Sequence, residues 1–461
     1  MIWLSNDSAG WEPMQTTLLL RAASLFSRQG WNPGRASALP VEQPACRTSR
    51  QIPLFWLVVA LLWSAYIAIA FFVATQTSIG SNAYSAYHQA AQAVIDGHAL
   101  YTGLDGWVYL YPPLLAQALT PIVALRSYEA AISLWFMLNI SLLLASVALL
   151  ARYVPLRARR WLWLSPMLFL PVWQALVLGQ VTIVLLALLT GVWVALREQR
   201  PALAGSLLAL AAWIKVFPAV LLLLFVWHRN WRLLAGTIVT GLVLLLVQIV
   251  ISGPATLVGF IRTLFDLIQN GQPAANYENL SLFAFLSRLF AENQFVDPLL
   301  ISPSLLSISR LVSLVGIVGI TGYAIVRAQK RQPASDIGWR SELQYALVIV
   351  TVLLMGSTLW VSGLPPLLLV YVLILRHQNQ PAHRRLINWW CGLSFWLITL
   401  HQPIVLLLTS NSRDANPLLL SGGFFGVLLL WVLLIRLLLT LPSTDTIAPP
   451  VLHSRRARRA A

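Results

Sequence analysis

Long apolar runs constrain this chain more than any other feature. They recur from Ile52 to Leu441 without a break long enough for a separate soluble domain. They lie at 54–73, 130–151, 161–178, 181–196, 233–251, 311–326, 343–355, 386–408 and 418–440. Most approach the ~20 residues that a helix needs to cross ~30 Å of hydrocarbon, where the backbone must satisfy its own hydrogen bonds. The sequence therefore predicts an all-α polytopic membrane protein with about 10–12 transmembrane helices.

Composition and charge support this class. Hydrophobic residues make up 58% of the chain and charged residues 10%, against about 45–50% and 25% in soluble domains. The net charge of +16 could suit a nucleic-acid-binding protein, but the basic residues stand in short clusters between the apolar runs. Such clusters mark cytoplasmic loops beside anionic lipid. We therefore expect membrane lipids, and no nucleic acid, as partners.

The same clusters orient the chain. Residues 1–52 carry five arginines and no signal-peptide layout, so they are predicted to be a cytoplasmic tail. The membrane domain is predicted at 53–441, with a basic cytoplasmic tail at 442–461. The loops 76–128 and 253–309 are predicted to face outside. The two cysteines suggest neither a disulfide nor a metal site, and no cofactor is expected.

Residues 202–227 have the length of one span, yet basic loops flank both ends. A pair of short re-entrant helices broken at Ile214–Pro218 restores the alternation of inside and outside loops. Lys215 lies in this break. A lysine at membrane depth costs ~2.5–3.5 kcal/mol and usually faces a polar interior, although it can also snorkel to the headgroups. The break predicts a covered cavity in which Lys215 could hold a lipid-linked phosphate.

The two outside segments carry the other candidate residues. The first has apolar or aromatic residues at 84, 87, 91, 94 and 95, which is the spacing of an interfacial helix. It also holds five of the twelve tyrosines, together with Trp107, Asp96 and Asp105. An aromatic belt explains some of the aromatic residues, but not the acids. The second segment is rich in polar groups and is long enough to be a lid or a binding surface, or else a solvated loop.

Several short motifs stand out in order along the chain: Tyr-Pro-Pro within Tyr109–Leu114, the pair Gly179-Gln180, and Arg200-Pro201 followed by Lys215 and Pro218. These motifs resemble those of the bacterial polyprenol-phosphate-mannose-dependent α-mannosyltransferases, a group within the GT-C glycosyltransferase superfamily. The run Tyr109–Leu114 is similar to their YPP element, and Gly179-Gln180 to their GQ turn. Residues 200–232 resemble a signature that combines an Arg-Pro, a Gly, a Lys-x-x-Pro and an Arg-x-Trp-like end. Asn276–Ser281 resembles an outside Asn-Ser element. The resemblance in the order and spacing of these motifs covers about residues 52–290.

The resemblance implies a glycosyltransferase of the bacterial inner membrane, while the basic clusters predict that both termini are in the cytoplasm. It implies a polyprenyl-phosphate sugar donor, with mannose as the sugar, and a lipid or glycan acceptor. The departing phosphate needs cations, for which Lys215, Arg262 and Arg288 are candidates. Substrate contacts are expected from Tyr109, Tyr111, Trp107, Gln180, Asn276, Glu278 and Ser281. No metal is expected, because no ligand cluster is visible in the sequence.

Two departures from the family pattern bear on catalysis. Ala83 stands where the family acid is expected, and 356–363 lacks the usual histidine. The acceptor hydroxyl needs a carboxylate as general base, and Asp105 or Asp96 could supply it. The alternative for Asp105 is a turn at Asp-Gly, and for Asp96 a cap before Gly97. A degenerate relative that only binds lipid-linked sugar therefore stays open. A lipid or polysaccharide transporter also stays open, although one broken segment lacks the matched partner that transporters show.

Overall fold

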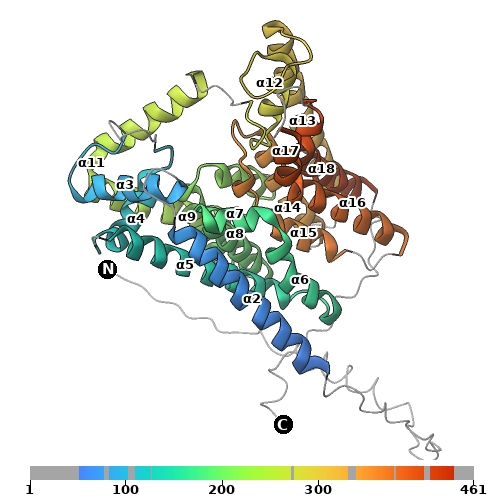
Figure 1. The fold of residues 1–461 in the computed structure, drawn as a ribbon, viewed down its shortest axis with the longest axis horizontal. Helices are drawn as coiled ribbons and strands as arrows, with labels where there is room; N and C mark the ends of the chain where they lie inside the picture. The colour runs from blue at the N-terminus through green and yellow to red at the C-terminus, as the bar shows by residue number, and fades with distance from the viewer. Residues whose placement is uncertain are drawn as a thin grey trace, which may run out of the picture. The chain divides into compact units, whose positions relative to one another are not determined.

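The structure is a computed structural model that describes residues 51–76, 82–101, 109–125, 127–270, 275–330, 339–377, 381–409 and 416–440. The chain divides into two compact units, Met1–Trp56 and Leu57–Ala461. The predicted tails at 1–52 and 442–461 fall almost wholly outside the described residues. The account that follows concerns the second unit (Figure 1).

The described residues are helical apart from turns, irregular connections such as 291–302, and one isolated antiparallel bridge, between Asn279 and Trp360. The first half contains α2 (Gln51–Thr75), α3 (Ala83–Ile95), α4 (Pro113–Val123), α5 (Tyr128–Ala151), α6 (Leu156–Leu168), α7 (Leu170–Val177), α8 (Thr182–Arg197), α9 (Pro201–Ile214), η1 (Phe217–Val220) and α10 (Leu221–Trp227). The second half contains α11 (Trp231–Asn270), α12 (Leu282–Phe290), α13 (Pro303–Gln329), α14 (Trp339–Met355), η2 (Val361–Gly363), α15 (Leu367–Leu375), α16 (Pro381–Thr399), α17 (His401–Thr409), η3 (Leu419–Ser421) and α18 (Gly422–Thr440).

Five of the described helices are long and apolar enough to cross a membrane, and the bent pair α16–α17 would make a sixth. The other apolar runs are built from shorter helices, such as α6 and α7, which meet at the extended residue Phe169. Side chains that face lipid explain the large exposed apolar surface, for example Val250 and Leu223. The prediction of an all-helical, multi-span membrane protein is confirmed.

The segment 202–227 is broken where the sequence predicts. Helix α9 ends at Ile214, Lys215 is extended, and η1 begins at Phe217 next to Pro218. Ala202 lies against Gly236 at the start of α9, and His228, after α10, contacts Gln344 near the start of α14. Since α9 and α11 pack along each other from the same end, α10 runs back toward the end where α9 began. The segment therefore enters and leaves at one end, with Lys215 at the far point.

Helix α11 bends at Gly253, whose φ of 73° lies in the left-handed region. The predicted outside segment 253–309 begins at this bend. It opens with further helical turns up to Asn270 and includes α12, so much of it is ordered structure rather than a solvated loop.

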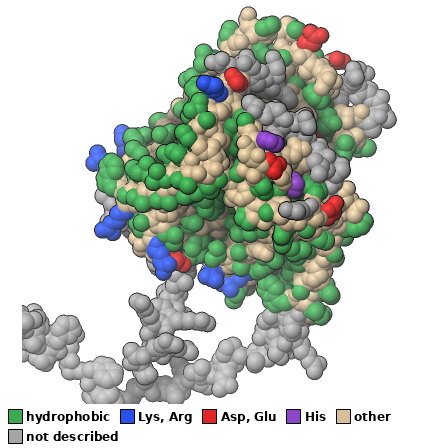
Figure 2. Space-filling view, turned by 90° about the vertical axis from the view of Figure 1, so that its left-hand side faces the viewer, with side chains coloured by type: hydrophobic (Ala, Val, Ile, Leu, Met, Phe, Trp, Pro, Cys, Tyr) green, Lys and Arg blue, Asp and Glu red, His purple; other side chains and the backbone are tan. Residues whose placement is uncertain are grey.

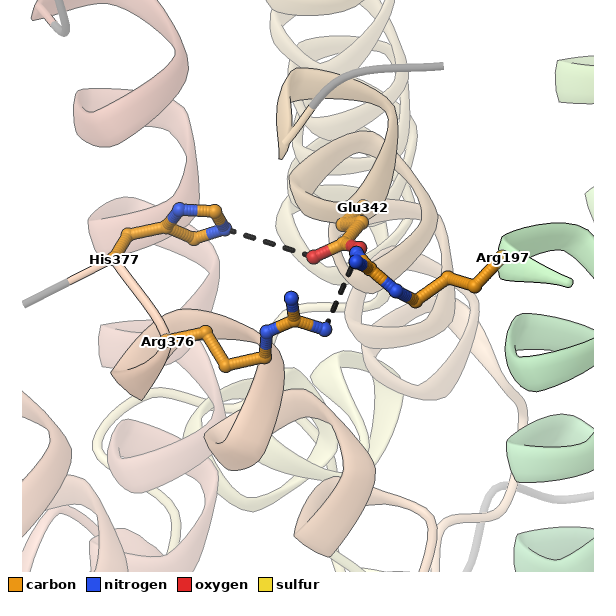
Figure 3. Close-up of polar contacts among 4 residues, drawn as sticks. All are labelled: Arg197, Glu342, Arg376 and His377. Atoms are coloured by element: carbon orange, nitrogen blue, oxygen red, sulfur yellow. Dashed lines mark hydrogen bonds and ion pairs between the residues drawn. The ribbon is translucent and has the colours of Figure 1, made fainter. Parts of the chain in front are cut away.

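A buried ion cluster joins α8, α14 and the C-terminal end of α15 (Figure 3). Glu342 of α14 pairs with Arg197 at the end of α8 and lies 3.5 Å from Arg376 Nη1, while His377 Nε2 is 3.9 Å from its other oxygen. Both guanidinium groups also lie over the Tyr153 and Trp193 rings. Burial, and then the two arginines, lower the pKa of His377 to about 3, so this imidazole is neutral at pH 7.

Candidate functional site at the end opposite the ion cluster

Helix α3 positions the first aromatic group of the site. Asn82 caps this helix, because its Oδ1 accepts from the Ser85 N–H at 2.9 Å and Ser85 returns a bond to the Asn82 backbone. The Tyr128 hydroxyl also donates to Asn82 Oδ1, which ties α3 to the start of α5. The Tyr87 side chain on α3 is 1% exposed. Burial raises the pKa of Tyr87 well above its usual value, so the phenol stays protonated.

The turn Gly179-Gln180 brings a polar side chain to Tyr87. Gly179 adopts a φ of 63°, and an added Cβ would lie 2.6 Å from Tyr84 Cβ, so this position requires glycine. Trp135 Nε1 donates to the Gly179 carbonyl at 2.8 Å. Gln180 Oε1 then lies 3.1 Å from the Tyr87 hydroxyl. Among the described residues no hydrogen bond engages Gln180 Nε2, which leaves this donor for a ligand.

The Tyr109–Leu114 run supplies a second aromatic group. The Tyr111 hydroxyl is 3.0 Å from the Tyr87 hydroxyl, and the two rings meet edge to face. Lys215 Nζ lies 5.5 Å from the Tyr111 ring centroid, within cation–π range. Three predicted site residues, Lys215, Tyr111 and Gln180, are thus brought together around Tyr87. Both Tyr111 and Lys215 are half-buried, so a ligand could reach them.

Tyr109, which the sequence predicts as a sugar contact, has a buried, supporting position in the turn. Its side chain is 1% exposed, and its hydroxyl donates to the Pro112 carbonyl and accepts from the Ala116 N–H, each at 3.1 Å. Burial raises its pKa well above the usual value. Tyr109 therefore fixes the turn that presents Tyr111.

Of the two predicted acids of the first segment, only Asp96 lies within the described residues. Asp105 lies outside the described residues, as does Trp107. Asp96 is exposed, ends α3 just before Gly97, and accepts two 3.0 Å hydrogen bonds from Gln92 Nε2. The cap that the sequence offers as an alternative for Asp96 is therefore present.

The three predicted phosphate-binding cations lie in different environments. Arg288 is 0% exposed and donates to Ser421 Oγ and to the Asn276 and Asn279 carbonyls at 3.0–3.1 Å. Burial lowers its pKa to about 10, so it stays charged, and its bonds hold the loop 275–281 against η3. Arg262 is exposed on α11 beyond the bend. Of the three, Lys215 is the cation in contact with Tyr111.

The loop 275–281 carries the remaining predicted residues. Asn276 Oδ1 accepts from the Glu278 N–H at 2.9 Å. Ser281 caps α12 and donates to the Ser357 carbonyl, so it has a structural role. Glu278 is half-buried, and its Oε1 accepts from Gln402 Nε2 at 3.1 Å.

Sequence reasoning missed Tyr87, Gln174 and Gln402 as site residues. Gln402 Oε1 accepts from Gln174 Nε2, which joins α17 to α7. Each glutamine interrupts an apolar helix, and that interruption is the signal that could have found them.

The sequence that contains most of these residues matches a known family. The pattern of glycosyltransferase family 87 matches residues 109–356, more than half of the chain, from Tyr109 of the site to the end of α14. The chain belongs to this family. The family 87 match includes Tyr111, Gln180, Lys215 and Glu278, whereas Tyr87 and Gln402 lie outside it.

Two further comparisons concern this family 87 glycosyltransferase. None of the curated proteins matches its sequence. A solved structure to which it is similar is ArnT from Cupriavidus metallidurans bound to undecaprenyl phosphate, at 15% identity and a TM-score of 0.37, over 84% of this chain and 77% of the ArnT chain.

Proposed function

We propose that this GT-C-like enzyme of the bacterial inner membrane transfers a sugar, expected to be mannose, from a polyprenyl-phosphate donor to a lipid or glycan acceptor on the outer face. The observation that carries the proposal is Lys215 at a break between short helices, over the Tyr111 ring and beside Tyr87 and Gln180. Membership of a glycosyltransferase family supports the reaction class.

The reaction needs a cation next to the departing phosphate. As the bond between the anomeric carbon and the phosphate oxygen breaks, negative charge grows on the polyprenyl phosphate, and a fixed ammonium stabilises it. Lys215 is positioned for this role because α9 ends directly before it and η1 begins two residues after it. The Tyr111 ring and Gln180 Nε2 would contact the sugar or the phosphate oxygens.

The test is sugar transfer by the purified protein in liposomes that contain polyprenyl-phosphate-mannose, with a lipid extract as the acceptor source. Labelled sugar that moves to an acceptor in wild type, and a fall in that transfer in Lys215→Met, are expected. Wild-type protein that neither binds the donor nor transfers sugar would refute the proposed function. Donors with glucose or arabinose in place of mannose test the identity of the sugar.

A second function, binding of lipid-linked sugar without turnover, is favoured by one observation. Ala83, at the position of the family acid, is the first residue of α3, and the neighbouring Asn82 is buried as its cap. Donor binding by wild type without transfer to any acceptor fraction would establish this alternative.

A further inference from the structure

A hydrogen-bonded chain ties one carboxylate to α7, the helix that leads into the Gly179-Gln180 turn of the site. Gln402 Nε2 donates to Glu278 Oε1 at 3.1 Å, and Gln402 Oε1 accepts from Gln174 Nε2. Gln174 is one residue before Ala175, whose carbonyl accepts the Gln180 N–H at 2.8 Å. Glu278 is therefore tied through two glutamines to the same α7 end that presents Gln180 to Tyr87.

We propose that Glu278 is the general base of the transfer reaction, with Gln402 and Gln174 as positioning residues. This proposal rests on the proposed function. It supplies a carboxylate in place of the family acid of the first outside segment, where this chain has Ala83. Asp96 is exposed and bonded to Gln92, and Asp266 is exposed on α11. Asp105 is the competing candidate and enters the test directly.

The surroundings of Glu278 suit a base. Among the described residues the ion pairs involve Glu198 and Glu342, and not Glu278, so no cation there competes for its proton-accepting oxygen. Its Oε1 is held by Gln402, and no hydrogen bond within the described residues engages Oε2. A neutral donor on one oxygen orients the carboxylate and leaves the other free for the acceptor hydroxyl.

The backbone around Glu278 is fixed from three sides. His401 Nδ1 accepts from the Gly423 N–H at 3.1 Å, so its Nε2 carries the proton and donates to the Tyr277 carbonyl at 2.8 Å. Arg288 binds the Asn276 and Asn279 carbonyls on either side. Leu280 N–H donates to the Leu359 carbonyl. Such support is what a catalytic side chain needs in order to keep its position.

The transfer moves the sugar to the acceptor and one proton to Glu278. The acceptor O–H gives its proton to Glu278 Oε2 while its oxygen forms a bond to the anomeric carbon. The bond from that carbon to the phosphate oxygen breaks, and its electron pair leaves with the polyprenyl phosphate, next to Lys215. The products are the glycosylated acceptor, polyprenyl phosphate and a protonated Glu278, which returns its proton to water.

The experiment compares Glu278→Gln with Glu292→Gln and Asp105→Asn in the full-length protein in liposomes. Glu292 is an exposed glutamate of the same outside segment, so it is a matched control. Glu278→Gln should reduce the transfer rate about 10²- to 10⁴-fold and keep the donor Kd within about twofold. Glu292→Gln should transfer at the wild-type rate. Unchanged transfer in Glu278→Gln, or loss of transfer in Asp105→Asn with donor binding kept, would overturn the proposal.

A second variant separates positioning from a merely structural role. Gln402→Leu removes the donor that favours the charged carboxylate, so the acid limb of the pH–rate profile should move to higher pH while the donor Kd is kept. Gln402→Glu should instead lower the rate across the range, because it places a second carboxyl group against the first. A rate that falls equally at every pH in Gln402→Leu would contradict the positioning role. Wild type that binds donor without any transfer would refute the transferase function and the base with it.

Discussion

The position of Lys215 is fixed by the residues before it and the residues after it. The extended conformation at Lys215 follows α9 directly, and Pro218 prevents the helix from continuing through η1. The side chain is left over the Tyr111 ring, where the ring face offers a partial substitute for water. A half-buried ammonium with an aromatic ring as its described neighbour is ready to accept an anionic ligand.

Replacing Lys215 by Met should weaken binding of a polyprenyl-phosphate sugar about 10- to 100-fold, which is the range for loss of a charge-assisted contact. The protein should remain folded, because the charged form was the costly one at this depth. Lys330→Met, at the exposed end of α13, is the matched control and should bind as wild type does. Equal donor affinity in all three proteins, measured by titration in detergent, would assign Lys215 to snorkelling.

His377 should make the stability of the fold depend on pH. Its pKa is about 3 in the folded chain and ~6.5 when unfolded, so the unfolded chain binds more protons between these values. Stability from this group is complete above pH 6.5 and falls as pH decreases, by roughly 1.4 kcal/mol per pH unit. Between pH 7 and pH 5, His377→Asn should therefore lose about 2 kcal/mol less than wild type in detergent melts. His98→Asn, at an exposed site, should behave like wild type.

Helix elements were predicted well where the signal is local. The break at Ile214–Pro218, the return of 202–227 to one end and the glycine turn at 179 follow from proline, charge and glycine chemistry in the sequence. The pairing of Gln174 with Gln402 joins residues 228 positions apart, and no local pattern encodes it. The surroundings of Arg288 were also not predictable from the sequence, because its hydrogen-bond acceptors lie 9, 12 and 133 positions away; its contact with phosphate stays a prediction.

The packing of α9 against α11 gives a test at the scale of elements. A Cβ at Gly205 would lie 2.0 Å from the Leu233 carbonyl oxygen, and one at Gly236 would lie 2.3 Å from the Ala202 oxygen. Small residues allow this approach of two backbones, which is how helices associate in lipid. Gly205→Ala should destabilise the protein by about 1–3 kcal/mol, because the backbone of α9 or α11 must move to make room for the methyl group. Gly316→Ala on α13, with nothing within 4 Å, is the control. Equal melting temperatures for the two variants would show that α9 and α11 do not approach this closely.

The two ends of the Leu57–Ala461 unit differ in their charged residues. Helices α5 and α8 begin near the site, at Tyr128 and Thr182. Arg152 directly follows the end of α5, and α8 ends at Arg197. On the face shown in Figure 2, most Lys and Arg side chains lie along the lower left margin, and most acidic side chains lie in the upper and right parts. The 16 residues of α8 correspond to ~24 Å between the Gly179-Gln180 turn and the ion cluster. The candidate site and the basic clusters therefore occupy opposite ends.

This separation leads to a prediction about which end faces out. Basic ends stay in the cytoplasm, so the site end should face outside. Single cysteines at His98 and Glu292, two exposed positions on the site side, should react in intact cells with a membrane-impermeant thiol reagent, in a background without Cys46 and Cys391. A cysteine at Lys330, exposed at the basic end, should react only after the cells are opened. The reverse pattern would place Lys215 and Glu278 toward the cytoplasm. A donor in the outer half of the bilayer could then not reach them, and the lipid-linked sugar would have to be presented from the inner leaflet.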